Sequence, residues 1–388
     1  MSSTSHQISE TFIDNYTDLL ALCEQLQNVS YLAVDTEFIR EKTYYPKLCL
    51  IQIAGDDIVA CIDPLAITDL NPLLDLLYNP DIVKVFHAAR QDLEIFYYLK
   101  NAIPAPLFDT QIAAALLGFS DQVAYMNLIS ELLGVHLDKG HSRTDWAKRP
   151  LDPEQLHYAA NDVRYLLQAY PLILEQLNAK GRHDWLADDF ATLANPELYE
   201  SHPDDLWKRV SGNSRLKGKQ LAALQKLAAW REQQAQAQDR PRKWIVSDDS
   251  LAILAQRMPA NQAEIGKIRG LNEGVIQKHG QAILDCIEQA LSTPVEQWPS
   301  HGKHIRLSPQ QDALADMLMA LIKIQAYTHQ VAASVLASRK EIEQFIQGER
   351  QLNLLTGWRR KMAGEMALEL LNGTRHLLVE QGEPITKV

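Results

Sequence analysis

The sequence has few cysteines, no long apolar run and no overall excess of positive charge. Its four cysteines, among 388 residues, show no CxxC or other short metal-ligand spacing, so neither a disulfide framework nor a zinc site is expected. No run of about 18 apolar residues occurs, and the N-terminus lacks the basic start and apolar stretch of a signal peptide. These absences predict a reduced, cytoplasmic protein without a membrane span.

The net charge of −11 argues, by itself, against a nucleic-acid partner. The charge is unevenly spread, however, because residues 1–200 carry 13 Lys and Arg against 29 Asp and Glu, whereas residues 201–388 carry 25 against 20. Within residues 206–244, ten basic and two acidic residues are interspersed with three tryptophans, which suits a phosphate backbone with stacked bases. A solvated helix face with tryptophans in the core would produce the same composition.

Strand-like and helix-like segments divide the chain. Short apolar segments rich in β-branched residues predict buried strands at 31–38, 48–54, 57–63 and 82–88. Apolar residues then recur at helical spacing, so the first half is expected to be an α/β domain. From about residue 200 onward no strand-like run stands out, and the second half is predicted to be all-helical. A turn-rich segment at 195–205 separates this half from the first, and another at 292–304 divides it in two.

Two acidic residues close the first predicted strand. Asp35 and Glu37 stand at i and i+2, so their side chains share one face of the strand. Strands often end in acidic residues that simply face water. Two converging carboxylates are also the donors that Mg²⁺ and Mn²⁺ prefer, and the pair therefore marks a candidate cation site.

Further candidates come later in the chain. Asp92 falls in the first turn of a predicted helix, where a lone acid also favours the helix dipole. Tyr158 and Asp162 stand at i and i+4 and share one helix face, as many packing pairs do. Each pattern is common alone, so only the combination and order of the segments can indicate a function.

That order resembles the three exonuclease motifs of the DEDD superfamily, in its tyrosine-containing subgroup, and is most similar to the ribonuclease D family. The matching segments are DTEF, HAARQDLEIF, FDTQIAAALL and SRTDWAKRPLDPEQLHYAANDVRYL. The resemblance covers roughly residues 15–190. It implies a ribonuclease H-like exonuclease domain over residues 1–195, with a mixed sheet flanked by helices.

The resemblance also implies the chemistry. Asp35, Glu37, Asp92 and Asp162 match the metal-binding acids, and Tyr158 matches the tyrosine of the third motif. Two divalent ions, Mg²⁺ or Mn²⁺, are expected, one between Asp35, Glu37 and Asp162 and one held by Asp35 and, through water, by Asp92. With a reference pKa of about 10, Tyr158 is expected to orient the attacking water rather than deprotonate it. The products would be 5′-mononucleotides released from the 3′ end.

Other residues of these segments are weaker candidates. His87, Arg143 and Trp146 are predicted to contact the substrate, although a histidine after a strand is more often a hydrogen-bonded structural residue. Asp109, which resembles a recurrent acid of the superfamily, is expected to cap a helix.

Residues 205–292 resemble the helicase-and-RNase-D C-terminal (HRDC) domain, a small helical module that binds nucleic acid. The resemblance rests on DRPRKWIVSDDSL, on the proline of AQRMP and on HGQAILDCI. It implies that Lys267 and Arg269, beside Gly270, meet phosphate at a turn. Residues 305–375 resemble a second, diverged copy, so two all-α HRDC-type domains are expected after the α/β domain.

The function implied is a 3′–5′ exoribonuclease that trims 3′ extensions from structured RNA, tRNA precursors in particular, with no membrane and no protein partner expected. A 3′–5′ exodeoxyribonuclease of the proofreading or repair type shares the catalytic motifs and stays open as an alternative. An inert RNA-binding scaffold is the other alternative. The intact acids argue against it, because converging carboxylates repel one another and cost stability without a metal.

Overall fold

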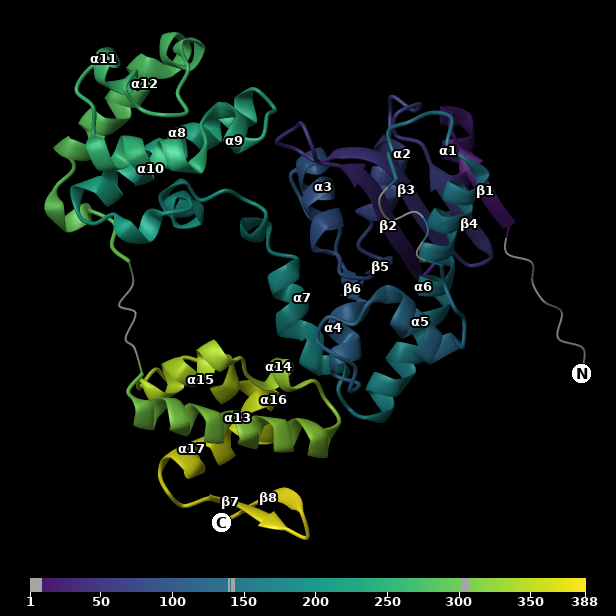
Figure 1. Ribbon diagram of the computed structural model, residues 1–388. Coiled ribbons are helices and arrows are strands. Elements are labelled where there is room, and N and C mark those ends of the chain that lie inside the picture. The colour runs from purple at the N-terminus through teal and green to yellow at the C-terminus, as the bar shows by residue number, and fades with distance from the viewer. Residues whose placement is uncertain (1–8, 139, 141–143, 302–306) are drawn as a thin grey trace, which may run out of the picture. The chain divides into compact units, whose positions relative to one another are not determined.

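The computed structural model describes residues 9–138, 140, 144–301 and 307–388 (Figure 1). The chain forms two compact units. Unit 1 comprises Met1–Glu37, Leu48–Leu198 and Arg306–Val388, and unit 2 comprises Phe38–Lys47 and Tyr199–Ile305. The domain limits given above stay predictions. Within the described ranges, no helix combines the length and the apolar character that a membrane crossing requires.

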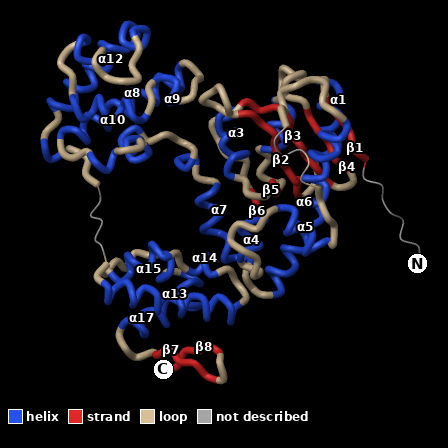
Figure 2. The backbone as a smooth tube through the Cα atoms, viewed as in Figure 1, coloured by secondary structure: helices blue, strands red, loops and turns tan. Residues whose placement is uncertain are grey.

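Unit 1 contains a mixed six-stranded sheet in the order β1-β4-β3-β2-β5-β6 (Figure 2). Strand β1 pairs parallel with β4, β2 with β5, and β5 with β6, whereas β3 and β4 are antiparallel. The four predicted strands are all present, and two short ones join them. The bounds are β1 (Ser9–Ile13), β2 (Tyr31–Ile39), β3 (Lys47–Gly55), β4 (Ile58–Ile62), β5 (Val83–Phe86) and β6 (Leu107–Asp109).

The helices that accompany this sheet are α1 (Tyr16–Leu26), α2 (Asn71–Leu77), α3 (Arg90–Lys100), α4 (Thr110–Ala115), α5 (Tyr125–Leu133), α6 (Pro153–Ala179) and α7 (Ala187–Leu193). The ring of Tyr31 on β2 packs against that of Tyr170 on α6, with centroids 4.7 Å apart. Because side chains alternate along a strand, Asp35 and Glu37 face α6 as Tyr31 does, and Thr36 between them faces the other side.

The C-terminal part of unit 1 is helical and ends in a hairpin. Its elements are α13 (Pro309–His329), α14 (Ala333–Leu336), α15 (Arg339–Ile346), α16 (Gly357–Arg359), α17 (Glu365–Leu371), β7 (His376–Glu380) and β8 (Glu383–Lys387). The hairpin shows that the prediction of no strand after residue 200 was wrong. Both strands are largely exposed, so they lack the apolar alternation that marks a half-buried strand. Gln381 and Gly382 have positive φ angles, as in two-residue hairpin turns.

The guanidinium of Arg182, which follows α6, joins the α/β part of unit 1 to this C-terminal part. Its Nη1 donates to the Leu116 carbonyl at 2.6 Å and to the Gln330 carbonyl at 3.1 Å, and Nη2 donates to the His329 carbonyl at 2.5 Å. The C-terminal helices are therefore held on the end of α4 by one buried and two partly buried hydrogen bonds.

Two side chains of the basic segment 357–361, GWRRK, contribute to the same internal contact. Trp358 stacks on Trp185, with ring centroids 4.4 Å and planes 7° apart. Arg359 pairs with Asp189 at 3.0 Å and covers the Trp358 ring. Trp358 and Arg359 are therefore engaged in contacts within the protein.

Unit 2 is a helical domain built from η3 (Pro203–Arg209), α8 (Lys219–Ala237), α9 (Arg242–Ile245), α10 (Asp248–Arg257), α11 (Gln262–Ile265) and α12 (Glu273–Ser292). Of the three tryptophans in its basic segment, Trp207 and Trp230 are buried in the core and only Trp244 is exposed, at 58%. The interpretation of these tryptophans as core residues therefore holds for Trp207 and Trp230.

Candidate active site

Three carboxylates converge where β2 meets α6. Asp35, Glu37 and Asp162 each offer an oxygen atom, and the three atoms lie within 4.8 Å of one another. Asp35 and Glu37 reach this point because they share one face of the strand. Asp162 reaches it from α6, whose start is fixed by a capping box between Asp152 and Gln155.

Burial and mutual repulsion give these acids a strong affinity for positive charge. Burial raises the pKa of Asp162 to about 7. Burial and the neighbouring carboxylates, Asp35 above all, raise the pKa of Glu37 to about 9. The pKa of Asp35 is raised well above its ordinary value by burial and by Asp162. The cluster must take up protons or a cation, and its hard oxygen donors fit Mg²⁺ or Mn²⁺.

Asp92 approaches the group of three from the other side of β2. It lies in the first turn of α3, only 7% exposed, and its Oδ1 accepts a hydrogen bond from Thr36 Oγ1 at 2.5 Å. Burial and the charge of Asp35 raise its pKa well above the ordinary value. Asp92 is thus electrostatically coupled to the group of three without being one of its members.

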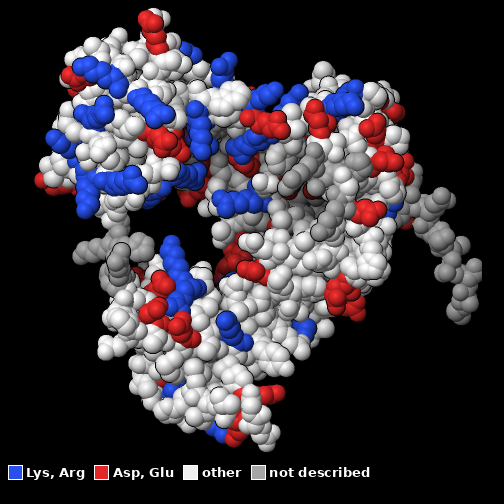
Figure 3. Space-filling model, in the orientation of Figure 1, with Lys and Arg blue, Asp and Glu red and all other residues white. Residues whose placement is uncertain are grey.

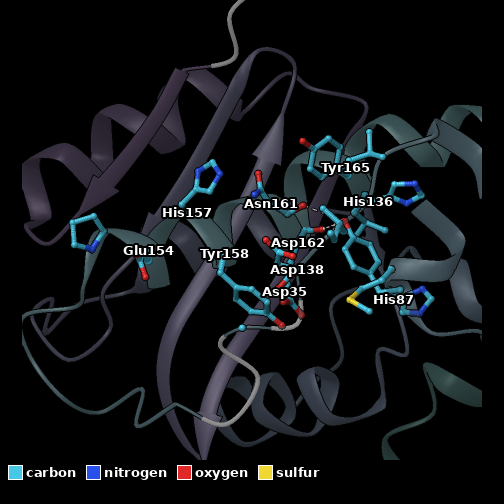
Figure 4. Close-up of a pocket in the computed structure, with 17 residues that line it drawn as sticks. Asp35, His87, His136, Asp138, Glu154, His157, Tyr158, Asn161, Asp162 and Tyr165 are labelled. Atoms are coloured by element: carbon cyan, nitrogen blue, oxygen red, sulfur yellow. Dashed lines mark hydrogen bonds between the residues drawn. The ribbon is translucent and has the colours of Figure 1, made fainter. Parts of the chain in front are cut away.

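Tyr158 lies one turn before Asp162 on α6. With Asp35 and Asp162 it lines a cavity of about 1050 Å³, large enough for a nucleotide. Figure 4 shows these three side chains pointing toward one another. Burial and the nearby carboxylates raise the pKa of Tyr158, so its hydroxyl stays protonated at neutral pH. A protonated phenol can donate a hydrogen bond but cannot remove a proton from water.

His87 also lines the cavity, but the protein engages both of its ring nitrogens. Nδ1 lies 3.0 Å from Thr110 Oγ1, and Nε2 lies 3.0 Å from the Val123 carbonyl. Burial lowers its pKa and favours the neutral ring. The predicted substrate contact of His87 finds no support in this arrangement, which is that of a structural histidine.

The remaining substrate-binding candidates lie in different places. Trp146 is 2% exposed, so its indole has no open face on which a base could stack, and a direct contact is not supported. Arg143 lies outside the described residues. Lys267 and Arg269 are exposed on unit 2, in the segment that follows α11.

Asp109 caps α4, as predicted. Its carboxylate accepts from the backbone N–H groups of Gln111 and Ile112. It also accepts from the N–H groups of Ala88 and Ala89, just before α3. The cap therefore fixes the start of the helix that carries Asp92.

Tyr125 is a site residue that the sequence reasoning missed. Its hydroxyl donates to the Asp162 carbonyl at 2.5 Å and to the Asn161 carbonyl at 3.2 Å, while its ring packs against His87. The contact holds the α6 backbone at Asp162, a member of the group of three carboxylates. No motif or spacing connects Tyr125 with Asp162, so the sequence offered no signal.

Two family models and several curated relatives match this chain. A family described as 3′-5′ exonuclease matches residues 11–178, and the HRDC domain matches residues 220–287. The Ribonuclease D of Gluconacetobacter diazotrophicus is 41% identical over 377 residues, covering 96% of this chain and 95% of the relative. That of Zymomonas mobilis is 43% identical over 382 residues, covering 97% of each.

A solved structure is similar over nearly the full length. It is the crystal structure of Escherichia coli RNase D, described as an exoribonuclease involved in structured RNA processing. It matches with a TM-score of 0.81 and 34% identity, covering 94% of this chain and 99% of that one. Fold and site together define a 3′–5′ exonuclease with an HRDC helical region. The chain belongs to the ribonuclease D family, and the predicted family, fold class and 3′–5′ exoribonuclease activity are confirmed.

Proposed function

We propose that this exoribonuclease works with two divalent ions, Mg²⁺ or Mn²⁺. Asp35, Glu37 and Asp162 would hold one ion, and Asp35 with Asp92 would hold the other. The observation that carries the first ion is the convergence of three carboxylate oxygens within 4.8 Å, and the electrostatic coupling of the buried Asp92 to Asp35 supports the second. Bound ions of this kind acidify a water and offset the charge that develops on the phosphoryl group.

The protein side chains supply position rather than proton transfer. Tyr158 donates its hydroxyl hydrogen to the attacking water and orients it toward phosphorus. Thr36 and the Asp109 cap keep Asp92 in place. Water attacks phosphorus and the 3′-oxygen of the next nucleotide leaves, so each cycle releases one 5′-mononucleotide.

The proposed substrates are structured RNAs with 3′ extensions, tRNA precursors among them. Two considerations support this choice, namely the resemblance of the motifs and the description of the Escherichia coli relative as a processor of structured RNA. The cytoplasmic location expected from composition stays a prediction.

Unit 2 is the proposed RNA-binding arm. Figure 3 shows Lys and Arg side chains gathered over its helices. Lys267 and Arg269 are exposed, and Gly270 has a φ of 91°, which lets the backbone turn there. Trp244 stays available for stacking. These cations would bind phosphate and anchor the RNA body.

The test is a nuclease assay on a 3′-extended tRNA precursor and on DNA of the same sequence, each with Mg²⁺, Mn²⁺ or EDTA. We expect mononucleotide release from RNA with either metal, none with EDTA and none with Asp35→Asn. Preferential degradation of DNA would contradict the proposed choice of structured RNA as substrate. Unchanged hydrolysis in EDTA would overturn the metal proposal.

A further inference from the structure

The guanidinium of Arg149 is at the centre of a bonded group just before α6. Nε donates to Asp63 Oδ2 at 2.6 Å and Nη2 donates to Asp63 Oδ1 at 2.7 Å, a bidentate pair. Nη2 also donates to the Cys49 carbonyl on β3 at 2.7 Å. Asp63, 3% exposed, directly follows β4. Arg149 is therefore anchored to two strands of the sheet.

The same guanidinium holds the turn that carries Trp146. Nη1 donates to the Trp146 carbonyl at 2.7 Å and to the Lys148 carbonyl at 2.9 Å. The turn closes on itself, because Asp145 accepts from the backbone N–H groups of Ala147 and Lys148. Arg149 thus fixes the backbone position of Trp146 relative to the sheet.

The indole of Trp146 has no hydrogen bond of its own to set its orientation. Nε1 is buried without an acceptor among the described residues. The ring packs against Tyr158, with centroids 6.4 Å apart and planes 33° apart. Packing and the backbone alone must then orient the indole, and the backbone is what Arg149 holds.

We propose that Arg149, locked by Asp63, is a positioning residue for Tyr158 and acts through Trp146. The inference rests on the proposed role of Tyr158 in orienting the attacking water. If the turn shifts, the indole shifts with it, and the Tyr158 hydroxyl no longer points toward the group of three carboxylates. Displacement of a reacting group by about 1 Å can cost about 100-fold in rate.

The test is a double-mutant cycle between Arg149→Lys and Tyr158→Phe, measured as kcat and KM on 3′-labelled RNA at saturating Mg²⁺. Lysine keeps the charge but cannot bridge Asp63 and the carbonyls as the planar fork does. We expect Arg149→Lys to lower kcat about 10- to 100-fold with KM little changed. In the Tyr158→Phe background no hydroxyl remains to be positioned. The same substitution should then lower kcat by less than about threefold.

Controls separate positioning from general damage. Arg182→Lys alters another arginine bonded to backbone carbonyls, in a different part of unit 1, and should leave kcat unchanged. Trp146→Phe runs through the same cycle, because it keeps the Trp146 carbonyl and stays informative if Arg149→Lys does not fold. It should show the same dependence on the Tyr158 hydroxyl.

Each contrary outcome has a distinct meaning. Equal losses in both backgrounds, or no loss from either substitution, overturn the positioning role of Arg149 and leave the metal site standing. Full activity of Tyr158→Phe alone overturns the proposed role of Tyr158, and the positioning role falls with it.

Discussion

Thr36 donates its hydroxyl hydrogen to Asp92 Oδ1 at 2.5 Å, across 56 residues of sequence. Thr36 stands between two members of the carboxylate group, and its side chain faces the opposite side of β2. Strand β2 therefore presents Asp35 and Glu37 on one face. From its other face it holds Asp92 through Thr36. The bond ties the first and second motif segments into one site.

Removing this bond should weaken the site without dismantling it. Thr36→Val keeps the shape of the side chain but leaves the buried Asp92 without its donor, so we expect about a 10-fold loss in kcat, equivalent to about 1.4 kcal/mol. The Mg²⁺ concentration for half-maximal activity should rise. Thr36→Ser, which keeps the hydroxyl, should stay close to wild type; equal losses in the two variants would show that the bond is unimportant.

Stability without metal should fall as the pH rises. The folded pKa values of Glu37, about 9, and Asp162, about 7, lie above those of the unfolded chain. The folded state therefore binds more protons than the unfolded chain. The stability that it gains from these protons is lost as the groups ionise between about pH 4 and about pH 9. In EDTA, the melting temperature should decline across this range.

Mg²⁺ should remove much of that decline, because the ion replaces the protons between the carboxylates. Asp162→Asn should flatten the EDTA curve by removing one of the repelling charges. The measurement is thermal unfolding across the pH range, with and without metal. Identical pH slopes in EDTA and Mg²⁺ would count against a carboxylate cation site.

The contact between Arg182 and the C-terminal helices should contribute to stability. Arg182→Ala leaves the Leu116 and His329 carbonyls without their donor, at a cost of about 1–3 kcal/mol in the free energy of unfolding. Lys180→Ala, which removes an exposed hydrogen bond nearby, should cost under about 0.5 kcal/mol. Denaturant unfolding of both variants is the check, and equal stabilities would contradict the assignment.

RNA affinity should depend on the cations of unit 2. In the double variant Lys267→Gln/Arg269→Gln, we expect weaker binding and a slope of log affinity against log salt that is smaller by about 1–2. A matched loss of two exposed charges in the C-terminal helices, Lys340→Gln/Lys361→Gln, should leave both quantities unchanged. Filter binding of the RNA at several salt concentrations compares the two double variants.

Charge variants are preferable here to truncation after unit 1's α/β part. Removing everything beyond about residue 200 would also remove the C-terminal helices that Arg182 and Trp185 hold. A loss of activity would then report a damaged fold as readily as a lost RNA contact.

Local spacing made much of the site predictable. Asp35 and Glu37 on a strand, and Tyr158 and Asp162 on a helix, share a face by backbone geometry alone. The contacts that support them could not be predicted, because Thr36 with Asp92, and Arg149 with Asp63, meet only through the tertiary fold. The sequence contains the residues but not their pairing.

The fold was predictable where apolar patterns are long. Apolar residues at helical spacing predict helices over 218–237 and 273–291, and α8 and α12 coincide with these ranges nearly residue for residue. The same spacing predicts one helix over 351–372, but in the structure this segment is interrupted by a 3₁₀ turn and a π-helical turn. A side chain on Gly364 would lie 2.2 Å from the Leu354 carbonyl, so close backbone packing, which no periodicity reveals, shapes this segment.

The most direct test of the central claim is a calorimetric titration of Mn²⁺ into the wild type, Asp162→Asn and Asp138→Asn. Asp138 is an exposed acid that lines the same cavity but does not belong to the group of three. We predict saturable binding with proton release for the wild type and Asp138→Asn, and at least a 10-fold weaker affinity, about 1.4 kcal/mol, for Asp162→Asn. Equal Mn²⁺ affinities in all three proteins would contradict the claim that Asp35, Glu37 and Asp162 hold the ion.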